Sequence, residues 1–302
     1  MKNARYLPLL LVLCIGQALA DTPINLRHAA SPDARVSVSN VKGQVTITAW
    51  DRNEVQVNGT LGNGAAPLAI EGDNGDLQIK VQPQGGSHGW FNWNGDNAMG
   101  PTTLDLHVPK GARLDVSVVS APLGIDGMDG GEISINSVSG RVRVDARTPV
   151  LTVDSVSGTV QQSGHAERAD LQTVSGDILA PALGISADLQ TVSGRIQAAG
   201  GPWHKFNLST VSGDVQVNGG VADHGSIDID SMSGNVQMQV PPDLSAAIHA
   251  SSFSGDLRSD FGKVSEHEHG PGSELNADVA GSRGRIHVET FSGDLRIRKK
   301  GD

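Results

Sequence analysis

Eight Ser-Gly pairs recur through the second half of the chain at near-constant spacing. Successive glycines of these pairs lie 18, 18, 18, 19, 21, 21 and 38 residues apart. The eight are Gly140, Gly158, Gly176, Gly194, Gly213, Gly234, Gly255 and Gly293. Self-similarity at a fixed period is typical of folds that stack one structural unit many times, so the repeat predicts an elongated, repetitive architecture.

Each repeat carries the pattern of a strand that ends in a tight corner. In the copy that ends at Gly158, apolar Leu151 and Val153 alternate with polar Thr152. Alternation with period two predicts a half-buried strand. Every copy then has Ser or Thr three residues before the glycine and Val, Met or Phe two residues before it. The Ser-Gly pair that follows predicts a turn, because glycine adopts positive φ without steric cost. The alternation resumes at Val160.

Equivalent columns at near-constant spacing favour a parallel stack over a series of hairpins. We therefore predict an all-β fold, a single elongated parallel β-solenoid with rungs of about 18–21 residues and a thin core. Strands stacked about 4.8 Å apart would make a rod of about 40 Å from eight or nine rungs. Residues 21–130 are interpreted as a less regular N-terminal part of this domain, and residues 131–302 as the regular repeats.

Two segments test the regularity of this stack. Residues 36–47 repeat the template near the N-terminus, with Asn40 and Lys42 at hydroxyl positions. Residues at about 260–285 form an insertion before the last repeat, which we interpret either as a degenerate rung or as a surface loop. The closing cluster of Arg296, Arg298, Lys299 and Lys300 is expected to cap the open end of the solenoid.

Residues 1–20 have the features of a secretory signal peptide. Lys2 and Arg5 precede an apolar stretch from Leu7 to Ile15, and Ala18-Leu19-Ala20 resembles a cleavage site. The apolar stretch is too short for a membrane-spanning helix, and no later stretch suggests one. The only cysteine, Cys14, lies within this segment, so no disulfide is expected after cleavage. The net charge of −10 disfavours nucleic acid as a partner.

Three sequence features resemble the bacterial putative adhesin family, a domain family of unknown function. These are the run Leu104–Val108 before Pro-Lys-Gly, the recurring Val-Ser-Gly-Asp-Ile/Val units, and the closing run Gly284–Leu295. The resemblance covers about residues 33–298. It implies a β-solenoid-like domain that is exported or belongs to the cell envelope, and it supplies no catalytic residues to transfer to this chain.

The best candidate binding site in the sequence is an aromatic cluster in a glycine-rich loop. Trp90, Phe91 and Trp93 lie close together in a chain with only 3% aromatic residues. Exposed aromatic side chains beside polar residues can stack on sugar rings or anchor a protein partner. The alternative is that these side chains fold back and cover one side or end of the solenoid.

Other motifs suggest chemistry less strongly. Gly85–Gly89 fits G-x-S-x-G, but no helix follows it as a nucleophile elbow requires. His267 and His269 could contribute to a metal site, although two histidines in a polar loop are a weak set. An acidic stripe that includes Asp170 and Asp188 could attract Ca²⁺ but lacks the expected glycine-rich calcium loops. We therefore expect no catalytic residues, no metal site and no cofactor.

The sequence favours a non-enzymatic function. We expect an exported protein of the periplasm or cell surface that binds or scaffolds at the cell envelope, with an envelope glycan or an envelope protein as its partner. Binding would use an extended polar face or the Trp90–Trp93 loop. Two alternatives stay open: an envelope-stress-linked regulatory component that acts through a protein partner, and a polysaccharide-active β-helix enzyme.

Overall fold

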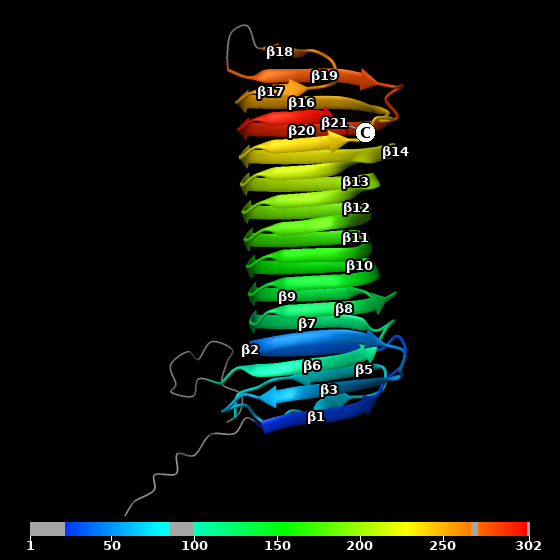
Figure 1. The fold of residues 1–302 in the computed structure, drawn as a ribbon, viewed down its shortest axis with the longest axis vertical. Coiled ribbons are helices and arrows are strands. Elements are labelled where there is room, and N and C mark those ends of the chain that lie inside the picture. The colour runs from blue at the N-terminus through cyan, green and yellow to red at the C-terminus, as the bar shows by residue number, and fades with distance from the viewer. Residues whose placement is uncertain (1–21, 85–98, 267–270, 301–302) are drawn as a thin grey trace, which may run out of the picture.

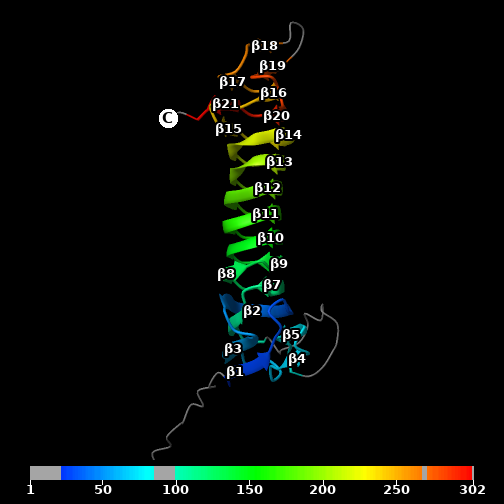
Figure 2. The ribbon, with the colours of Figure 1, turned by 90° about the vertical axis from the view of Figure 1, so that its right-hand side faces the viewer.

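The computed structural model describes residues 22–84, 99–266 and 271–300, and these residues form strands and connecting turns without any helix. The fold is an elongated stack of strands, flattened when seen from the side (Figures 1 and 2). Among these residues, no helix is long and apolar enough to cross a membrane. The predicted signal peptide, residues 1–20, lies outside the described residues.

Five long strands form the regular middle of the stack, and each one bends around the coil. They are β10 (Val142–Ser157), β11 (Val160–Ser175), β12 (Ile178–Ser193), β13 (Ile196–Ser212) and β14 (Val215–Ser233). Consecutive members pair in parallel, so equivalent residues of the repeats lie one above another; Leu151, for example, pairs with Ala169. The prediction of an all-β parallel solenoid is therefore confirmed.

The bend divides every long strand between two faces of the coil. The first part of β10 pairs with β8, and its last part pairs with β9. We call the faces face 1 and face 2. Besides the long strands, face 1 contains β1 (Thr22–Ala29), β3 (Glu54–Leu61), β6 (Thr102–Pro109), β8 (Leu123–Asp129), β15 (Val236–Val240), β17 (Leu257–Ser259) and β21 (Leu295–Lys299). Face 2 contains β4 (Ile70–Gly72), β5 (Asp76–Lys80), β7 (Arg113–Ser120), β9 (Ile133–Ser139), β16 (Ala246–Ser254), β18 (Val264–Glu266), β19 (Ser273–Val279) and β20 (Gly284–Ser292).

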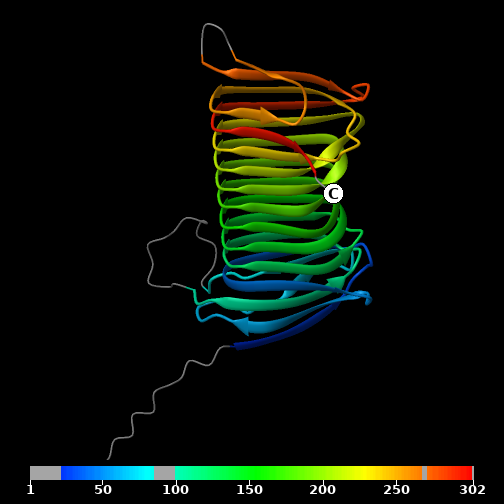
Figure 3. The same ribbon diagram turned by 45° about the horizontal axis from the view of Figure 1, so that its top comes forward.

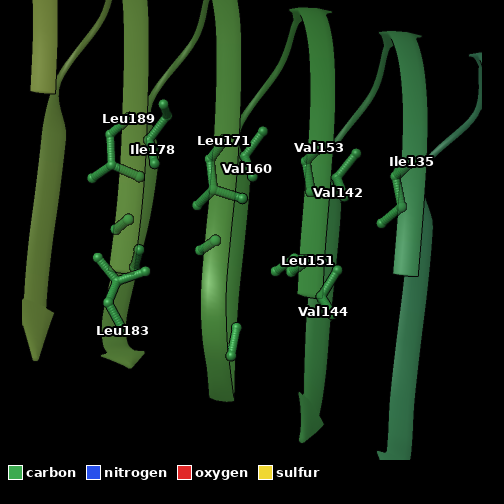
Figure 4. Close-up of a cluster of buried hydrophobic side chains, with 14 of the residues drawn as sticks. Ile135, Val142, Val144, Leu151, Val153, Val160, Leu171, Ile178, Leu183 and Leu189 are labelled. Carbon is green, nitrogen blue, oxygen red and sulfur yellow. The ribbon is translucent and has the colours of Figure 1, made fainter. Parts of the chain in front are cut away.

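The core is a thin apolar layer between the two faces (Figure 4). In β10, Val142 and Val144 come from face 1, and Leu151 and Val153 come from face 2; all four are buried. Because side chains alternate along a strand, the polar residues between them point outward. The period-two pattern of the sequence thus sets which side chains fill the interior.

The Ser-Gly corners are turns, as predicted, and they are also very crowded. Seven of the eight corner glycines have positive φ, and Gly176 is the exception. A Cβ atom on Gly158 or on Gly176 would overlap the carbonyl oxygen of the equivalent glycine one rung below. Glycine is therefore required at Gly176 for space alone, and at the other corners for both space and conformation.

The order of rungs does not follow the order of the sequence at either end. β20 lies between β14 and β16 on face 2, and β21 lies between β15 and β17 on face 1. Figure 3 shows this last, red segment within the stack. The expectation that Arg296, Arg298, Lys299 and Lys300 cap an open end is wrong for β21, because its backbone is paired on both sides along Leu295–Ile297.

The N-terminal end mirrors this arrangement. β2 (Arg35–Trp50) bends around the coil and lies between β5 and β7 on face 2. On face 1 its second half lies between β6 and β8. The sequence match of residues 36–47 to the repeat template is confirmed by these parallel pairings.

Antiparallel strands cover both ends of the stack. At one end, β3 pairs antiparallel with β6 and β1 pairs antiparallel with β3. At the other, β19 pairs antiparallel with β16, and β18 with β19. The insertion at about 260–285 is thus neither a degenerate parallel rung nor simply a loop, because its described part is an antiparallel cap. At the C-terminal end the outermost strand, β18, is only three residues long, so it leaves few unpaired backbone groups for another chain.

Candidate functional site

A column of exposed apolar side chains runs along the Ser-Gly corners. It consists of the residues two positions before each corner glycine, which are between 44% and 60% exposed. In spatial order they are Val138, Val156, Val174, Val192, Val211, Met232, Phe291 and Phe253. Isolated exposed apolar residues are common on proteins, but a contiguous strip is typical of an interaction surface. We call this strip the apolar column.

Beneath the apolar column lies a column of buried hydroxyl side chains. Its members are three positions before the glycines, and they are Ser137, Ser155, Thr173, Thr191, Thr210, Ser231, Thr290 and Ser252. Seven of these hydroxyl groups have no hydrogen-bond partner among the described residues; Ser252 contacts the carbonyl oxygens of Gly255 and Gly293 at 3.5 and 3.4 Å. The corner thus reverses the usual polarity, with hydroxyl groups inside and apolar groups outside.

Polar residues four positions before the glycines line the groove alongside the apolar column. They are Asn136, Asp154, Gln172, Gln190, Ser209, Asp230, Glu289 and Ser251. Two of the amides are held in place on their own strand: Gln172 donates to Asp170 at 3.0 Å, and Gln190 donates to Asp188 at 2.9 Å. These carboxylates belong to the acidic stripe noted in the sequence, which is outward and half-buried.

Together these columns line an open groove of about 1260 Å³. It extends from Ser117 of β7 across the stack to Phe253 of β16 and Ser273 of β19. Since its lining repeats at each rung, the groove presents similar chemistry at about every 4.8 Å. Such a surface suits an extended chain better than a compact small molecule.

The groove changes character near the C-terminal cap. Phe253 and Phe291 stack there with ring centroids 4.8 Å apart and planes 7° apart. Beside them, burial and the neighbouring Glu289 carboxylate raise the pKa of Asp230 above its usual value. This end therefore combines aromatic surface with close-set carboxylates.

The same region gathers two histidines that the sequence places far apart. His249 of β16 and His287 of β20 pair in register, and their rings stack 5.1 Å apart with planes 4° apart. His287 Nε2 lies 3.1 Å from Glu289 Oε1. Both histidines lie six positions before their corner glycines, so the shared column was a signal that could have paired them.

The sequence-predicted site lies outside the described residues. Trp90, Phe91 and Trp93 all fall within residues 85–98, as does the G-x-S-x-G motif, and His267 and His269 fall within residues 267–270. Sequence reasoning missed the apolar column as a surface feature. The alternation of side chains along a strand could have revealed it, because alternation places the hydroxyl column inside and the apolar column outside.

Several solved bacterial proteins are similar to this chain over nearly its whole length at low sequence identity. A putative adhesin from Parabacteroides merdae ATCC 43184 is 11% identical, with 93% of this chain and 100% of that chain covered and a TM-score of 0.48. A putative adhesin from Bacteroides fragilis NCTC 9343 is 11% identical, with 93% and 98% covered and a TM-score of 0.43. A putative lipid binding protein from Parabacteroides distasonis ATCC 8503 is 13% identical, with 93% and 97% covered and a TM-score of 0.43.

The search of curated proteins gives no match. The comparison with family models does, and it agrees with the resemblance that the repeats suggested. The model described as Toastrack DUF4097 matches residues 34–298, which include every parallel rung described above. This chain therefore belongs to the Toastrack DUF4097 family.

Proposed function

We propose that this protein is an exported, adhesin-like, non-enzymatic protein that binds an extended protein segment at the cell envelope along the groove. The observation that carries the proposal is the apolar column, which stays exposed over eight successive rungs. Binding is favoured when a partner removes an apolar strip of this length from water. The adjoining amides and carboxylates would supply polar contacts for the partner's backbone and side chains.

A protein partner suits the groove better than a glycan. Proteins commonly hold sugar rings with exposed aromatic faces. In the described part of the groove, aromatic side chains occur only at Phe253 and Phe291, whereas the middle rungs offer valine methyl groups. Glycan binding at Trp90, Phe91 and Trp93 is the second candidate, and it rests on the aromatic cluster in the sequence.

The repetition of the groove supports a non-enzymatic function. Catalysis requires particular groups in one arrangement, for example a nucleophile beside a base. The described groove instead presents the same three columns from rung to rung. Export remains part of the proposal and rests on the signal-peptide features of residues 1–20.

Co-sedimentation with separated outer-membrane and cell-wall fractions tests this function. The full chain would be expressed in bacteria and the protein purified from the envelope in four forms. The groove variant combines Val174→Thr, Val192→Thr and Val211→Thr, which keep side-chain shape and strand preference. Ile185→Thr is the matched control, because Ile185 is 47% exposed but does not line the groove. Trp90→Ala with Trp93→Ala is the fourth form.

We expect the wild-type protein and the Ile185 control to bind the same fraction. The groove variant should bind about tenfold to a hundredfold more weakly, because each lost methyl contact contributes about 1 kcal/mol. Unchanged binding by the groove variant would overturn the groove as the site. Loss only in the tryptophan variant would favour glycan binding by the aromatic cluster.

A further inference from the structure

Beyond envelope binding, we propose that His249, His287 and Glu289 form a site for a divalent transition-metal ion of the Zn²⁺ type on the outer side of face 2. One potential ligand atom from each residue lies within 4.8 Å of the other two. The three residues come from two neighbouring strands, β16 and β20, which pair in parallel and in register. The site therefore needs two adjacent rungs and cannot form from one repeat alone.

One spacing between potential ligand atoms already matches that of a metal site, and the others, all within 4.8 Å, need a small closure. Metal–nitrogen and metal–oxygen distances of about 2.0–2.2 Å place the ligand atoms of a tetrahedral site about 3.3 Å apart. His287 Nε2 and Glu289 Oε1 are already 3.1 Å apart. His249 already has a potential ligand atom within 4.8 Å of those of His287 and Glu289, and its side chain is 41% exposed, so a small shift would complete the site without moving the core.

Hydrogen bonding leaves His249 with a nitrogen suited to a metal. Its Nδ1 lies 2.7 Å from Asn276 Oδ1, while Asn276 Nδ2 donates to Glu274 Oε1 at 2.6 Å. An amide oxygen can only accept, so Nδ1 carries the proton and Nε2 keeps its lone pair. An imidazole that donates from one nitrogen to an outer partner and binds a metal with the other is typical of metal sites.

The surrounding charges favour a cation. Glu289 pairs in register with Asp230 on β14, and Glu274 lies 3.7 Å from His249 Nδ1. The nearby Arg285 is positioned against Asp228, at 3.8 Å. Two imidazoles with a carboxylate suit Zn²⁺, Cu²⁺ and Ni²⁺, whereas Ca²⁺ and Mg²⁺ prefer all-oxygen sites.

Isothermal titration of the chelator-treated full chain with ZnCl₂ tests the site, with MgCl₂ as the control ion. The variants are His249→Gln, His287→Gln and Glu289→Gln. His204→Gln is the matched control, because His204 is an exposed histidine on another rung. A double variant of His267→Gln and His269→Gln separates this site from the histidines of the 267–270 segment. Thermal melting verifies that each variant is folded.

We expect one saturable Zn²⁺ site per chain and no comparable Mg²⁺ binding. Each of the three site variants should weaken Zn²⁺ binding by at least about tenfold, because even loss of an outer-shell partner of a metal ligand costs about that much. The His204 control and the 267/269 double variant should bind as the wild type does. In NMR spectra, Zn²⁺ should shift the ring signals of His249 and His287 but leave those of His204 in place.

Three results would overturn the site: no saturable Zn²⁺ binding, binding that is unchanged in the His249 and His287 variants, or binding that is lost only in the 267/269 variant. The result is independent of the proposed groove function, because the titration contains no envelope fraction. Failure of the metal site therefore leaves the co-sedimentation test unaffected.

Discussion

At the scale of single residues, the corner glycines meet two separate requirements, positive φ and close approach of the neighbouring rung. Gly194 has a φ of 147°, and a Cβ there would overlap the Gly176 carbonyl oxygen. Gly130 has a φ of 106° with open space around it, and Gly124 has neither constraint. The chain thus contains its own controls for the two effects.

We predict that Gly194→Ala lowers the free energy of unfolding by about 2–4 kcal/mol, from φ strain and overpacking together. Gly130→Ala should cost only the strain, about 1–2 kcal/mol. Gly124→Ala should be neutral or stabilising by up to about 1 kcal/mol. Urea unfolding curves give all three values. Equal losses in the three variants would contradict the crowding argument.

The buried hydroxyl column leads to a prediction of opposite sign. Thr191 is 4% exposed, and its hydroxyl has no hydrogen-bond partner among the described residues. Replacing an unpaired buried hydroxyl by a methyl group of similar size removes a desolvation cost. Thr191→Val should therefore raise the free energy of unfolding by about 1 kcal/mol. Destabilisation in the same urea assay would show that the hydroxyl has a bonding role.

At the scale of strands, the insertion of β20 and β21 should change where the stack frays. Chain termini usually exchange their amide hydrogens quickly because they unfold locally. Here the terminal β20 is paired on both sides, whereas β18, which is internal in sequence, pairs only with β19. We predict that Ile286 and Val288 amides exchange as slowly as those of β14, and that β18 amides exchange first.

Amide hydrogen exchange followed by NMR or mass spectrometry measures this order directly. The long strands β11 and β12 serve as the internal reference for slow exchange. Fast exchange throughout β20 and β21, with slow exchange in β18, would contradict the inserted position of the terminal strands.

The strands also show how far the sequence could predict this fold. Alternation around Leu151 and Val153 identified the strands, and matching columns identified their parallel register. The position of β20 could not be predicted, because near-identical repeats are compatible with one another in any order. Column matching shows that His287 can lie above His249, but not that β20 is inserted between β14 and β16.

The candidate site, too, could be predicted from the sequence only in part. The column that includes Val174 was visible in the sequence. The alternation of side chains along the strand placed this column on the outer surface. The sequence analysis nevertheless did not identify these apolar residues as a surface feature. The groove itself forms only when successive rungs stack, because its lining comes from residues of many rungs. The histidine pair could have been found from the sequence, because His249 and His287 occupy the same column of two consecutive repeats.

At the scale of the whole molecule, the stack is a rigid support for one long surface. Parallel pairing on both faces and antiparallel caps hold the rungs in register, so the apolar column remains continuous from β9 to β16. Solenoids commonly use such extended surfaces for binding. The proposed function therefore predicts that contact with a partner at the cell envelope is confined to the groove.

In-cell photocrosslinking along the chain tests this claim most directly. A photoreactive residue would replace Val156, Val174, Val192 or Val211 in the groove, or Ile185 outside it, in the full chain. We predict that all four groove positions yield one common crosslinked envelope species and that Ile185 does not. Crosslinks from Ile185 equal to those from the groove, or none from any groove position, would show that the groove is not the contact surface.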